Sequence, residues 1–446
     1  MFYDKETESM PRKQLDKLQL ERLQDVVKRV YENCEPYRAK MDAAGIMPDD
    51  IKCLGDLKRL PFTTKEDLRD NYPYGMFSAP KTDIVRLHAS SGTTGKLTVA
   101  GYTQGDLDTW SAVMARSLVT SGCDKGSIVN IAYGYGLFTG GLGVHYGSEE
   151  LGCITIPASS GNTKRQLQLL KDFGATTLCC TPSYALYLAD EMGKEGYALS
   201  DFKLKQGIFG AEQWTEEMRN NIERKLGIKA YDIYGISEIT GPGVAVECEY
   251  QCGAHIWEDH FLPEILDLET LESLDYEEQG ELVLTTLTKT GMPLIRYRTR
   301  DITSLIAKPC KCGRTHVRMT RLLGRSDDML TIRGVNVFPS QIESALLSTD
   351  CLEPHYQIIA DRANNLDTLE VQVELSDRWL GDENILPGLK KTIEKDIASA
   401  ISLSCLVTFV KHGTMERSQS KAERVKDNRK LVTALAPLPP ARQDVV

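Results

Sequence analysis

The 446-residue sequence lacks several features that would assign it to a simple functional class. It contains no uninterrupted apolar run long enough to span a bilayer, which argues against a transmembrane helix. It has no Lys/Arg run, and its net charge of −10 disfavours a dedicated nucleic-acid-binding protein. Its first residues contain no apolar core of the secretory kind, so we expect a cytoplasmic protein. In that compartment the 12 cysteines are expected to be reduced thiols or metal ligands rather than disulfides.

Internal repeats and low-complexity blocks are also absent, and the length suits two or three domains. Between about residue 80 and residue 300, β-rich runs such as 127–133 and 281–286 alternate with helical runs such as 163–173. This alternation predicts a layered α/β architecture. From Asp328 onward the pattern is that of a smaller α+β unit, with a strand expected over 369–375 and a helix over 386–400.

An amphipathic helix is expected near the beginning of the chain, over residues 14–31. Apolar side chains recur there at spacings of three and four, with charged residues between them. We expect this helix to pack on the main body of the protein rather than to bind a partner.

The segment from 90 to 96 is the most informative stretch of the chain. It comprises Ser90, Ser91, Gly92, Thr93, Thr94, Gly95 and Lys96. Its two glycines allow backbone N–H groups to close on an anion, and hydroxyls and an ammonium surround the same few atoms. It is not the common P-loop, because only two residues separate the glycines and Leu97 follows the lysine. The loop suits a nucleotide polyphosphate, with an ordinary surface turn as the alternative.

Further segments carry side chains suited to nucleotide chemistry. Tyr234 could stack on adenine, and Glu238 could hold Mg²⁺ as a hard oxygen ligand, although a buried tyrosine and a surface glutamate would fit the same strand end. Asp301 could accept hydrogen bonds from both hydroxyls of a ribose, or simply pair with a neighbouring arginine. Residues 324–328 combine glycine with short polar residues, as a hinge requires. Lys421, considered alone, is an ordinary solvated lysine.

Together and in this order, these segments resemble the adenylate-forming superfamily of acyl-CoA ligases, and in particular its phenylacetate–CoA ligase branch. The resemblance covers nearly the whole chain and includes the motifs at 60–68, 133–141, 181–184, 209–212 and 253–261. It implies a large α/β N-terminal domain of several subdomains with layered sheets and helices over 1–326, and a small mobile α+β C-terminal domain over 327–434. Residues 435–446, which contain three prolines, are expected to form a loose tail.

The resemblance also implies roles for individual residues. The loop at 90–96 would hold the β- and γ-phosphates of ATP, and Glu238 would serve Mg²⁺. Asp301 and Arg325 would bind the ribose. The adenine would be framed by Ala211, Glu212, Asp232 and Tyr234.

Two half-reactions at one site follow from the same resemblance. Lys421 would reach from the small domain to the carboxylate and the α-phosphate. The residue before this lysine is usually glycine in the family, whereas this chain departs from that pattern with Ser420. After the adenylate forms, the small domain would rotate about Asp327. That rotation would remove Lys421 and bring the face carrying Gly334 to the adenylate, opening a path for the CoA thiol.

An acyl pocket is expected from a mixture of aromatic and small residues, which make a flat apolar slot suited to an aryl group. Its candidates are Tyr135, Phe138, Gly141 and Ile236. Plain core packing is the alternative for each of them.

Cysteines and histidines gather in two places that together could form a tetrahedral zinc site of three sulfurs and one nitrogen. The resembled branch often carries cysteine at 248, histidine at 255 and the Pro-Cys-x-Cys-Gly run, but not a cysteine at 252. The expected ligands of a closed structural site are therefore Cys248, His255, Cys310 and Cys312, with Cys252 and His316 as spare candidates. Four unrelated reduced residues are the alternative.

These observations predict an ATP-dependent aryl-acid–CoA ligase that releases AMP and pyrophosphate, with phenylacetate as the first choice of acid. Another arylacetate such as indoleacetate, or a benzoate, is the nearest alternative. A CoA-independent adenylyltransferase acting on a deazaflavin coenzyme is a second, and a non-catalytic nucleotide-binding protein a third. The intact Lys421, Glu238 and Asp301 argue against the last. The expected partners are a small aromatic carboxylic acid, ATP and CoA, without nucleic acid or membrane, and the family suggests a homodimer.

Overall fold

A computed structural model describes residues 1–90, 97–327, 329–333, 335–347, 352–363, 366–375, 386–411, 413–415 and 424–431. Its α-helices are α1 (Lys5–Glu8), α2 (Arg12–Asn33), α3 (Glu35–Ala44), α4 (Lys65–Asp70), α5 (Gln104–Thr120), α6 (Thr139–Leu151), α7 (Thr163–Asp172), α8 (Pro182–Lys194), α9 (Glu216–Leu226), α10 (Pro339–Leu347) and α11 (Leu386–Ile401). Short 3₁₀ turns occupy Pro48–Asp50, Leu54–Arg59, Lys81–Asp83, Leu199–Asp201 and Asn428–Leu431.

The strands fall into five sheets among the described residues. Strands of the first half are β1 (Ile84–Ser90), β2 (Thr98–Thr103), β3 (Ile128–Ile131), β4 (Ile154–Ile156), β5 (Thr177–Cys180), β6 (Gln206–Phe209), β7 (Lys229–Ile236), β8 (Gly241–Glu247), β9 (Ala254–Ile256) and β10 (Phe261–Leu266). The others are β11 (Gly280–Thr286), β12 (Tyr297–Thr303), β13 (Leu305–Ile306), β14 (Arg318–Met319), β15 (Gly324–Arg325), β16 (Leu330–Ile332), β17 (Val335–Val337), β18 (Leu352–Ala363), β19 (Leu366–Leu375), β20 (Leu406–Val410) and β21 (Val425–Asp427).

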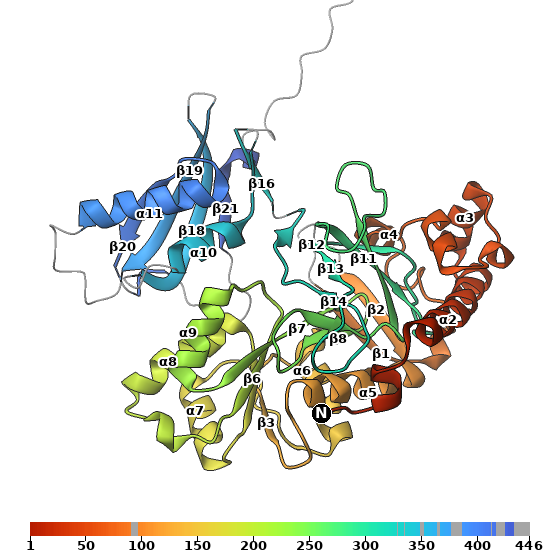
Figure 1. Cartoon of the computed structure of the whole chain (residues 1–446), viewed down its shortest axis with the longest axis horizontal. Coiled ribbons are helices and arrows are strands. Elements are labelled where there is room, and N and C mark those ends of the chain that lie inside the picture. Colours follow the sequence, from red (N-terminus) through yellow and green to blue (C-terminus); the bar gives the residue numbers. More distant parts are fainter. Residues whose placement is uncertain are drawn as a thin grey trace, which may run out of the picture. The chain divides into compact units, whose positions relative to one another are not determined.

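The chain divides into two compact units near Asp327. The larger comprises Met1–Trp214 and Arg219–Asp327, and the smaller includes most of the chain after Asp327, drawn in blue in Figure 1. Each unit has its own buried apolar cluster. Among the described residues, no helix combines the length and the apolar character that crossing a membrane requires.

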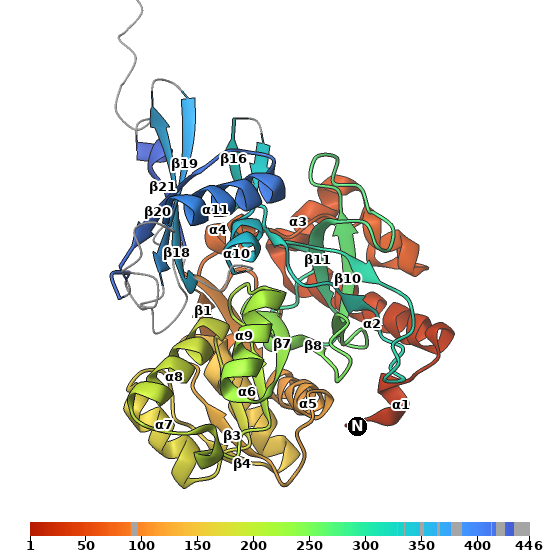
Figure 2. The ribbon, with the colours of Figure 1, turned by 60° about the vertical axis from the view of Figure 1, so that its left-hand side comes forward.

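A mixed sheet of nine described strands forms the centre of the larger unit, in the order β13-β14-β9-β8-β7-β6-β5-β3-β4. The sheet changes from parallel to antiparallel pairing at strand β7, which pairs parallel with β6 and antiparallel with β8. Helices α5 and α6 pack together and against β8, while α7 and α8 lie beside the parallel strands on the other side (Figures 1 and 2). Ligands of such sheets bind beyond the carboxyl ends of the parallel strands, so residues that follow β6 and β7 are well placed for a site.

The helix expected over 14–31 is confirmed as α2, Arg12–Asn33. Leu23, Val27 and Val30 are buried on one face of this helix, and Leu20 packs partly buried against the same core. The helix expected over 163–173 and the strand expected over 281–286 are also confirmed, as α7 and β11. The strand expected over 127–133 is shorter, because β3 covers Ile128–Ile131.

The smaller unit is an α+β structure, as its sequence pattern predicts. Its four-stranded sheet has the order β20-β19-β18-β21, with β18 and β19 antiparallel and both outer pairs parallel. Helix α11, Leu386–Ile401, buries Ile393, Ile397 and Ile401 in the core of this unit. The spacing of these three residues by four is that of one helix face.

Candidate active site

The segment after β6 places a strained residue and a carboxylate at the carboxyl edge of the large sheet. Ala211 has a φ of 70°, a left-handed conformation that is uncommon for a residue with a Cβ atom. Glu212 Oε1 accepts a hydrogen bond of 2.7 Å from the backbone N–H of Ser183 in the first turn of α8. The carboxylate therefore stabilises that helix N-terminus and ties α8 to the segment after β6.

Asp232, on β7 next to this segment, is held by a buried network. Its Oδ1 accepts a hydrogen bond of 2.9 Å from the indole of Trp214, and its backbone N–H donates to Glu247 at 2.8 Å. Glu247 in turn forms a buried ion pair with Arg219 at 2.6 Å. The indole of Trp214 thus orients the carboxylate of Asp232, while the Arg219–Glu247 pair fixes the backbone of this residue.

Tyr234, Asp301, Arg325 and Asp327 form a continuous chain of polar contacts. The Tyr234 hydroxyl donates to Asp301 Oδ2 at 2.6 Å, and Arg325 Nη1 donates to Asp301 Oδ1 at 3.1 Å. Burial and then the charge of Asp301 raise the pKa of Tyr234 well above its ordinary value, so the hydroxyl stays protonated as a donor. Arg325 also donates two hydrogen bonds, of 2.8 and 2.9 Å, to the carboxylate of Asp327. This fork arrangement links Asp301 to the last residue of the larger unit.

Glu238 lies in the turn after β7 and meets residues from two other elements. Its side chain is almost fully buried, and Oε1 accepts a hydrogen bond of 2.9 Å from the hydroxyl of Ser90 at the end of β1. The ammonium of Lys65, the first residue of α4, is 3.8 Å from the same oxygen. A carboxylate beside the start of the 90–96 segment is a suitable ligand for Mg²⁺.

The proposed acyl-pocket residues lie close to the same turn. A hydrogen bond of 3.1 Å joins the hydroxyls of Thr139, at the start of α6, and Ser237. Phe138 directly precedes α6 and is 57% exposed, while Tyr135 and Ile236 are half-buried against the main core. A Cβ atom added to Gly141 would be 2.7 Å from the backbone oxygen of Gly134, so a side chain there would displace the backbone before Tyr135.

Several predicted residues lie outside the described part of the chain. They are Ser91, Gly92, Thr93, Thr94, Gly95, Lys96, Gly334 and Lys421. Their roles remain predictions.

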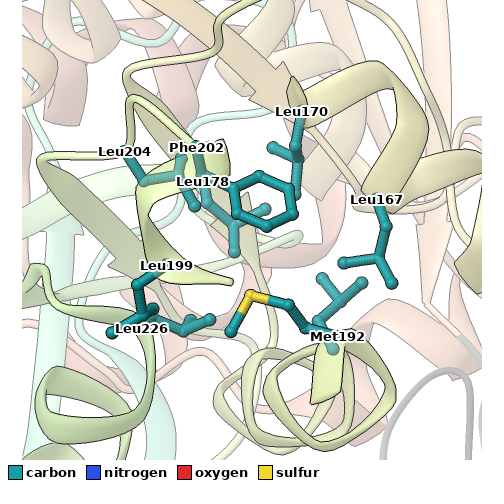
Figure 3. A pocket seen from close by; sticks show the side chains of 9 residues that line it. Leu167, Leu170, Leu178, Met192, Leu199, Phe202, Leu204 and Leu226 are labelled. Atoms are coloured by element: carbon teal, nitrogen blue, oxygen red, sulfur yellow. The ribbon is translucent and has the colours of Figure 1, made fainter. Parts of the chain in front are cut away.

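A cavity elsewhere in the larger unit has the wrong chemistry for the site (Figure 3). Its volume is about 10 Å³, and its walls are formed by leucine, methionine and phenylalanine side chains such as Leu178, Met192 and Phe202. That volume is about the room of one water molecule, and the walls offer no side chain that could hold a phosphate or a carboxylate.

A cluster of four potential metal ligands is formed by Cys248, His255, Cys310 and Cys312, whose ligand atoms all lie within 4.8 Å of one another. Cys248 Sγ and Cys310 Sγ are 3.6 Å apart, and Cys312 Sγ is 3.4 Å from His255 Nε2. A tetrahedral zinc ion holds its ligand atoms roughly 3.5 to 3.8 Å apart, given Zn–S of about 2.3 Å and Zn–N of about 2.0 Å. The hydrogen bond from Cys248 is the largest of the influences that lower the pKa of Cys312. The same contact raises the pKa of the Cys248 thiol.

The surroundings of the cluster favour these four residues over the two spare candidates. His255 Nδ1 is 3.3 Å from the carbonyl of His316, an arrangement that leaves Nε2 facing the thiols. His316 binds backbone groups through both ring nitrogens, since Nδ1 accepts from Glu258 N–H at 2.9 Å and Nε2 is 3.1 Å from the carbonyl of Thr7. Cys252 is exposed, and although its Sγ is 3.7 Å from Cys310, it accepts a hydrogen bond of 2.8 Å from Arg318.

Comparison with known families identifies both parts of the chain. Residues 18–288 match the family described as AMP-binding enzyme, and residues 334–429 match the AMP-binding enzyme C-terminal domain. A phenylacetate-coenzyme A ligase of Thermus thermophilus is 48% identical over 445 residues, which cover 96% of this chain and 100% of that protein. The phenylacetate-coenzyme A ligase of Escherichia coli is 50% identical, covering 94% of this chain and 96% of that one.

The chain belongs to the phenylacetate–coenzyme A ligase family of AMP-binding enzymes. The crystal structure of a 2-hydroxyisobutyryl-CoA ligase, in the postadenylation state in complex with R3-HIB-AMP, matches it with a TM-score of 0.90. The two are 29% identical, and the match covers 96% of this chain and 93% of the other. The fold is therefore that of the adenylate-forming ligases, as the resemblance in the sequence predicts.

Three residues near Glu238, namely Lys65, Tyr102 and Lys289, have no role that the sequence alone suggested. Lys65 stands in the motif at 60–68, which carries the resemblance but suggests no function for the lysine. Tyr102 contacts the turn that carries Glu238 from 138 residues away along the chain, and Lys289 contacts it from 50 residues away. The sequence holds no local signal for either contact, because both depend on the tertiary fold.

Proposed function

We propose that this protein joins an aryl acid to CoA at the expense of ATP, with phenylacetate as the first choice of acid. The observation that carries the proposal is the identity of 48–51% to four curated phenylacetate-coenzyme A ligases over more than nine-tenths of the chain. The side chains that gather at the carboxyl edge of the large sheet support it, because they provide oriented carboxylates where a nucleotide would lie.

In the first half-reaction, a carboxylate oxygen of the acid attacks the α-phosphorus of ATP. A new P–O bond forms, the bond to the bridging oxygen of the β-phosphate breaks, and pyrophosphate leaves with the bonding electron pair. Asp301 would accept hydrogen bonds from the ribose hydroxyls, with Arg325 beside it, and Asp232 and the 211–212 segment would border the adenine. These contacts position the nucleotide, which is a large part of catalysis in such a transfer.

The residues around Glu238 fit a magnesium ion. The carboxylate of Glu238 would hold it as a hard oxygen ligand, with Ser90 orienting that carboxylate. The ion would supply positive charge to the departing pyrophosphate. Lys421 and the loop at 90–96 would contribute the remaining positive charge and backbone donors.

In the second half-reaction, the CoA thiolate attacks the carbonyl carbon of the acyl-adenylate, the C–O bond to the phosphate breaks and AMP leaves. We propose that the small domain rotates about Asp327 between the two steps, exchanging Lys421 for the face that carries Gly334. The contact between Arg325 and Asp327 supports a hinge that is linked to the ribose site.

A structural zinc ion at Cys248, His255, Cys310 and Cys312 is part of the proposal. The distances among the four ligand atoms support it, and so does the backbone contact of His255 Nδ1. This ion would join the segments around β9 and the 310–312 loop without taking part in the reaction. We also propose that the protein is cytoplasmic and homodimeric; light scattering of the purified protein tests the second point.

The test is an acid panel with the purified protein, in which AMP release is measured with and without CoA. We expect CoA-dependent AMP release with phenylacetate and little with acetate. Fast turnover with indoleacetate or a benzoate but not with phenylacetate would transfer the assignment to that acid. Adenylation of a deazaflavin coenzyme without any use of CoA would overturn the ligase assignment.

A further inference from the structure

The turn from Ser237 to Thr240 carries Glu238. Two buried side chains, Lys289 and Tyr102, donate hydrogen bonds to its backbone carbonyl groups. Lys289 Nζ donates to the carbonyl oxygens of Glu238 at 3.1 Å and Ile239 at 2.8 Å. The Tyr102 hydroxyl lies 3.1 Å from the carbonyl of Ser237 and 3.0 Å from that of Thr240, and shares its one proton between them. All four consecutive carbonyl groups of the turn are therefore bound by these two side chains.

Lys289 is an unusual residue for this position. It is only 6% exposed, and the charges of Asp106 and Glu238 act on its ammonium. The ammonium sits 4.4 Å from the centre of the Tyr102 ring, which offers a cation–π contact. Burial of an ammonium is unfavourable, and an apolar residue of similar size would avoid the penalty. The contacts with the turn provide a reason for its presence.

The loop that carries Lys289 is itself fixed in place. Asp106, near the start of α5, accepts hydrogen bonds from the backbone N–H groups of Thr290 at 2.6 Å and Gly291 at 2.8 Å. On the other side of Lys289, the Thr288 hydroxyl is 2.8 Å from His260 Nδ1. The lysine therefore extends from a rigid loop, and its ammonium can determine where the turn lies.

The carboxylate of Glu238 depends on the backbone of this turn. Its side chain is almost fully buried and its Oε1 is already directed at Ser90, so a shift of the turn would move the carboxylate relative to the end of β1. Mutation of a group that orients a metal ligand typically lowers metal affinity about 10- to 100-fold.

We infer that Lys289, together with Tyr102, is a positioning residue that sets the backbone of the 237–240 turn so that Glu238 can bind Mg²⁺. This inference rests on the proposed function, in which Glu238 holds the magnesium ion of ATP. It assigns Lys289 to the metal-dependent half-reaction alone, because thioester formation from a finished acyl-adenylate needs no metal-bound pyrophosphate.

The experiment uses the full-length protein and measures the half-reactions separately. Pyrophosphate release is followed in single turnover at a series of Mg²⁺ concentrations, and thioester formation is followed from supplied phenylacetyl-adenylate and CoA. For Lys289→Met we expect the Mg²⁺ concentration at half-maximal pyrophosphate release to rise about 10- to 100-fold. Thioester formation should stay within about twofold of the unmodified protein. Tyr102→Phe should shift the Mg²⁺ requirement in the same direction by less, because only one shared proton is lost.

A destabilised control separates positioning from general loss of structure. Leu178→Ala removes buried methyl groups beside the apolar cavity of Figure 3, which is formed by other elements than the turn. This variant should lower the melting temperature while the Mg²⁺ requirement stays unchanged. Equal loss of both half-reactions in Lys289→Met at an unchanged Mg²⁺ requirement would overturn the inference. If Lys289→Met does not fold, Tyr102→Phe provides the same comparison, and an unchanged Mg²⁺ requirement in that variant overturns it.

The variant Glu238→Gln separates the positioning role of Lys289 from the proposed Mg²⁺-binding role of Glu238, on which that positioning role depends. If Glu238→Gln raises the Mg²⁺ requirement and Lys289→Met does not, the metal role stands and the positioning role is refuted. If Glu238→Gln leaves the Mg²⁺ requirement unchanged, the metal role of Glu238 fails, and the inference fails with it.

Discussion

Replacement of Tyr234 by phenylalanine removes one buried hydroxyl and tests the proposed ribose site directly. In the structure this hydroxyl donates to Asp301 at 2.6 Å, and both side chains are almost fully buried. A hydrogen bond to a charged group contributes about 1.5 to 3 kcal/mol. If the same bond orients Asp301 toward the ribose, that energy corresponds to about a 10- to 150-fold loss of nucleotide affinity, at 1.36 kcal/mol per tenfold.

The assay compares the KM values for the three substrates in steady state. We expect Tyr234→Phe to raise the KM for ATP by about tenfold or more, within the range that the hydrogen-bond energy allows. The KM values for phenylacetate and CoA should change little. The affinity for supplied phenylacetyl-adenylate should fall in parallel with that for ATP, because both molecules carry the same ribose. This pattern differs from that of Lys289→Met, in which only the metal-dependent step is impaired.

Tyr37→Phe is a matched control for the loss of a buried tyrosine hydroxyl. Tyr37 is equally inaccessible and donates to the carbonyl of Pro61 at 2.7 Å, but it belongs to α3. It should lower stability without a change in the KM for ATP. A KM for ATP within twofold of the unmodified protein in Tyr234→Phe would refute the idea that this hydroxyl orients the ribose ligand. The same result in Asp301→Asn would remove Asp301 from the ribose site altogether.

Three further predictions concern the metal cluster, a buried ion pair and the acyl pocket. The purified protein should contain about one zinc ion per chain, and Cys312→Ser should lower metal content and melting temperature with little direct effect on catalysis, as metal analysis and thermal unfolding can show. Burial alone would raise the pKa of Asp259, but His260 and Arg116 hold it well below 3.8, so its contribution to stability is present at neutral pH and is lost as the pH falls below about 4. Asp259→Asn should therefore lower the free energy of unfolding by about 3 kcal/mol at pH 7, and denaturant midpoints should show this gap shrinking at pH 3; a gap independent of pH would contradict the assignment. Gly141→Val should reduce kcat/KM for phenylacetate about tenfold more than that for acetate, because a Cβ atom there would lie 3.2 Å from the Tyr135 ring and only the aryl group of the acid needs the space beside that ring; an unchanged ratio would remove Gly141 from the pocket.

Local periodicity predicted the regular elements well, because it reflects which face of each element is buried. The spacing of Leu23, Val27 and Val30 is sufficient to predict α2, and the isoleucines of α11 follow the same rule. Periodicity does not encode which strands pair. The run that forms β7 contains no sign that it pairs parallel on one side and antiparallel on the other, although that change sets the edge where Tyr234 and Glu238 lie.

The cysteine-rich segments illustrate how far a sequence can narrow a site. The sequence offers more cysteine and histidine candidates than a tetrahedral zinc ion can use, and spacing alone does not choose among them. The choice depends on where the remaining donor atoms point. His316 binds the backbone through both nitrogens, and Cys252 accepts a hydrogen bond from Arg318. These contacts involve segments far apart in the chain, so only the fold can reveal them.

Lys289 is a residue whose environment the sequence predicts wrongly. It lies in a polar run of threonines beside a glycine, a context typical of an exposed loop, yet it is buried beneath the turn that carries Glu238. A buried ammonium is tolerated only where its hydrogen bonds are satisfied, and here the acceptors are backbone carbonyls rather than a carboxylate. Burial lowers the pKa of Lys289 to about 8, and the negative charges of Asp106 and Glu238 partly oppose that shift, so the ammonium is still mostly protonated at pH 7 and acts on the site together with these carboxylates. The lysine would thus repel the metal slightly while attracting the phosphates, and Lys289→Arg, which keeps the charge but alters the hydrogen-bond geometry, separates the two effects. If charge were the dominant contribution, the arginine variant would retain the ATP affinity of the unmodified protein; if geometry dominates, as the four bound carbonyls indicate, it should resemble Lys289→Met in its Mg²⁺ requirement.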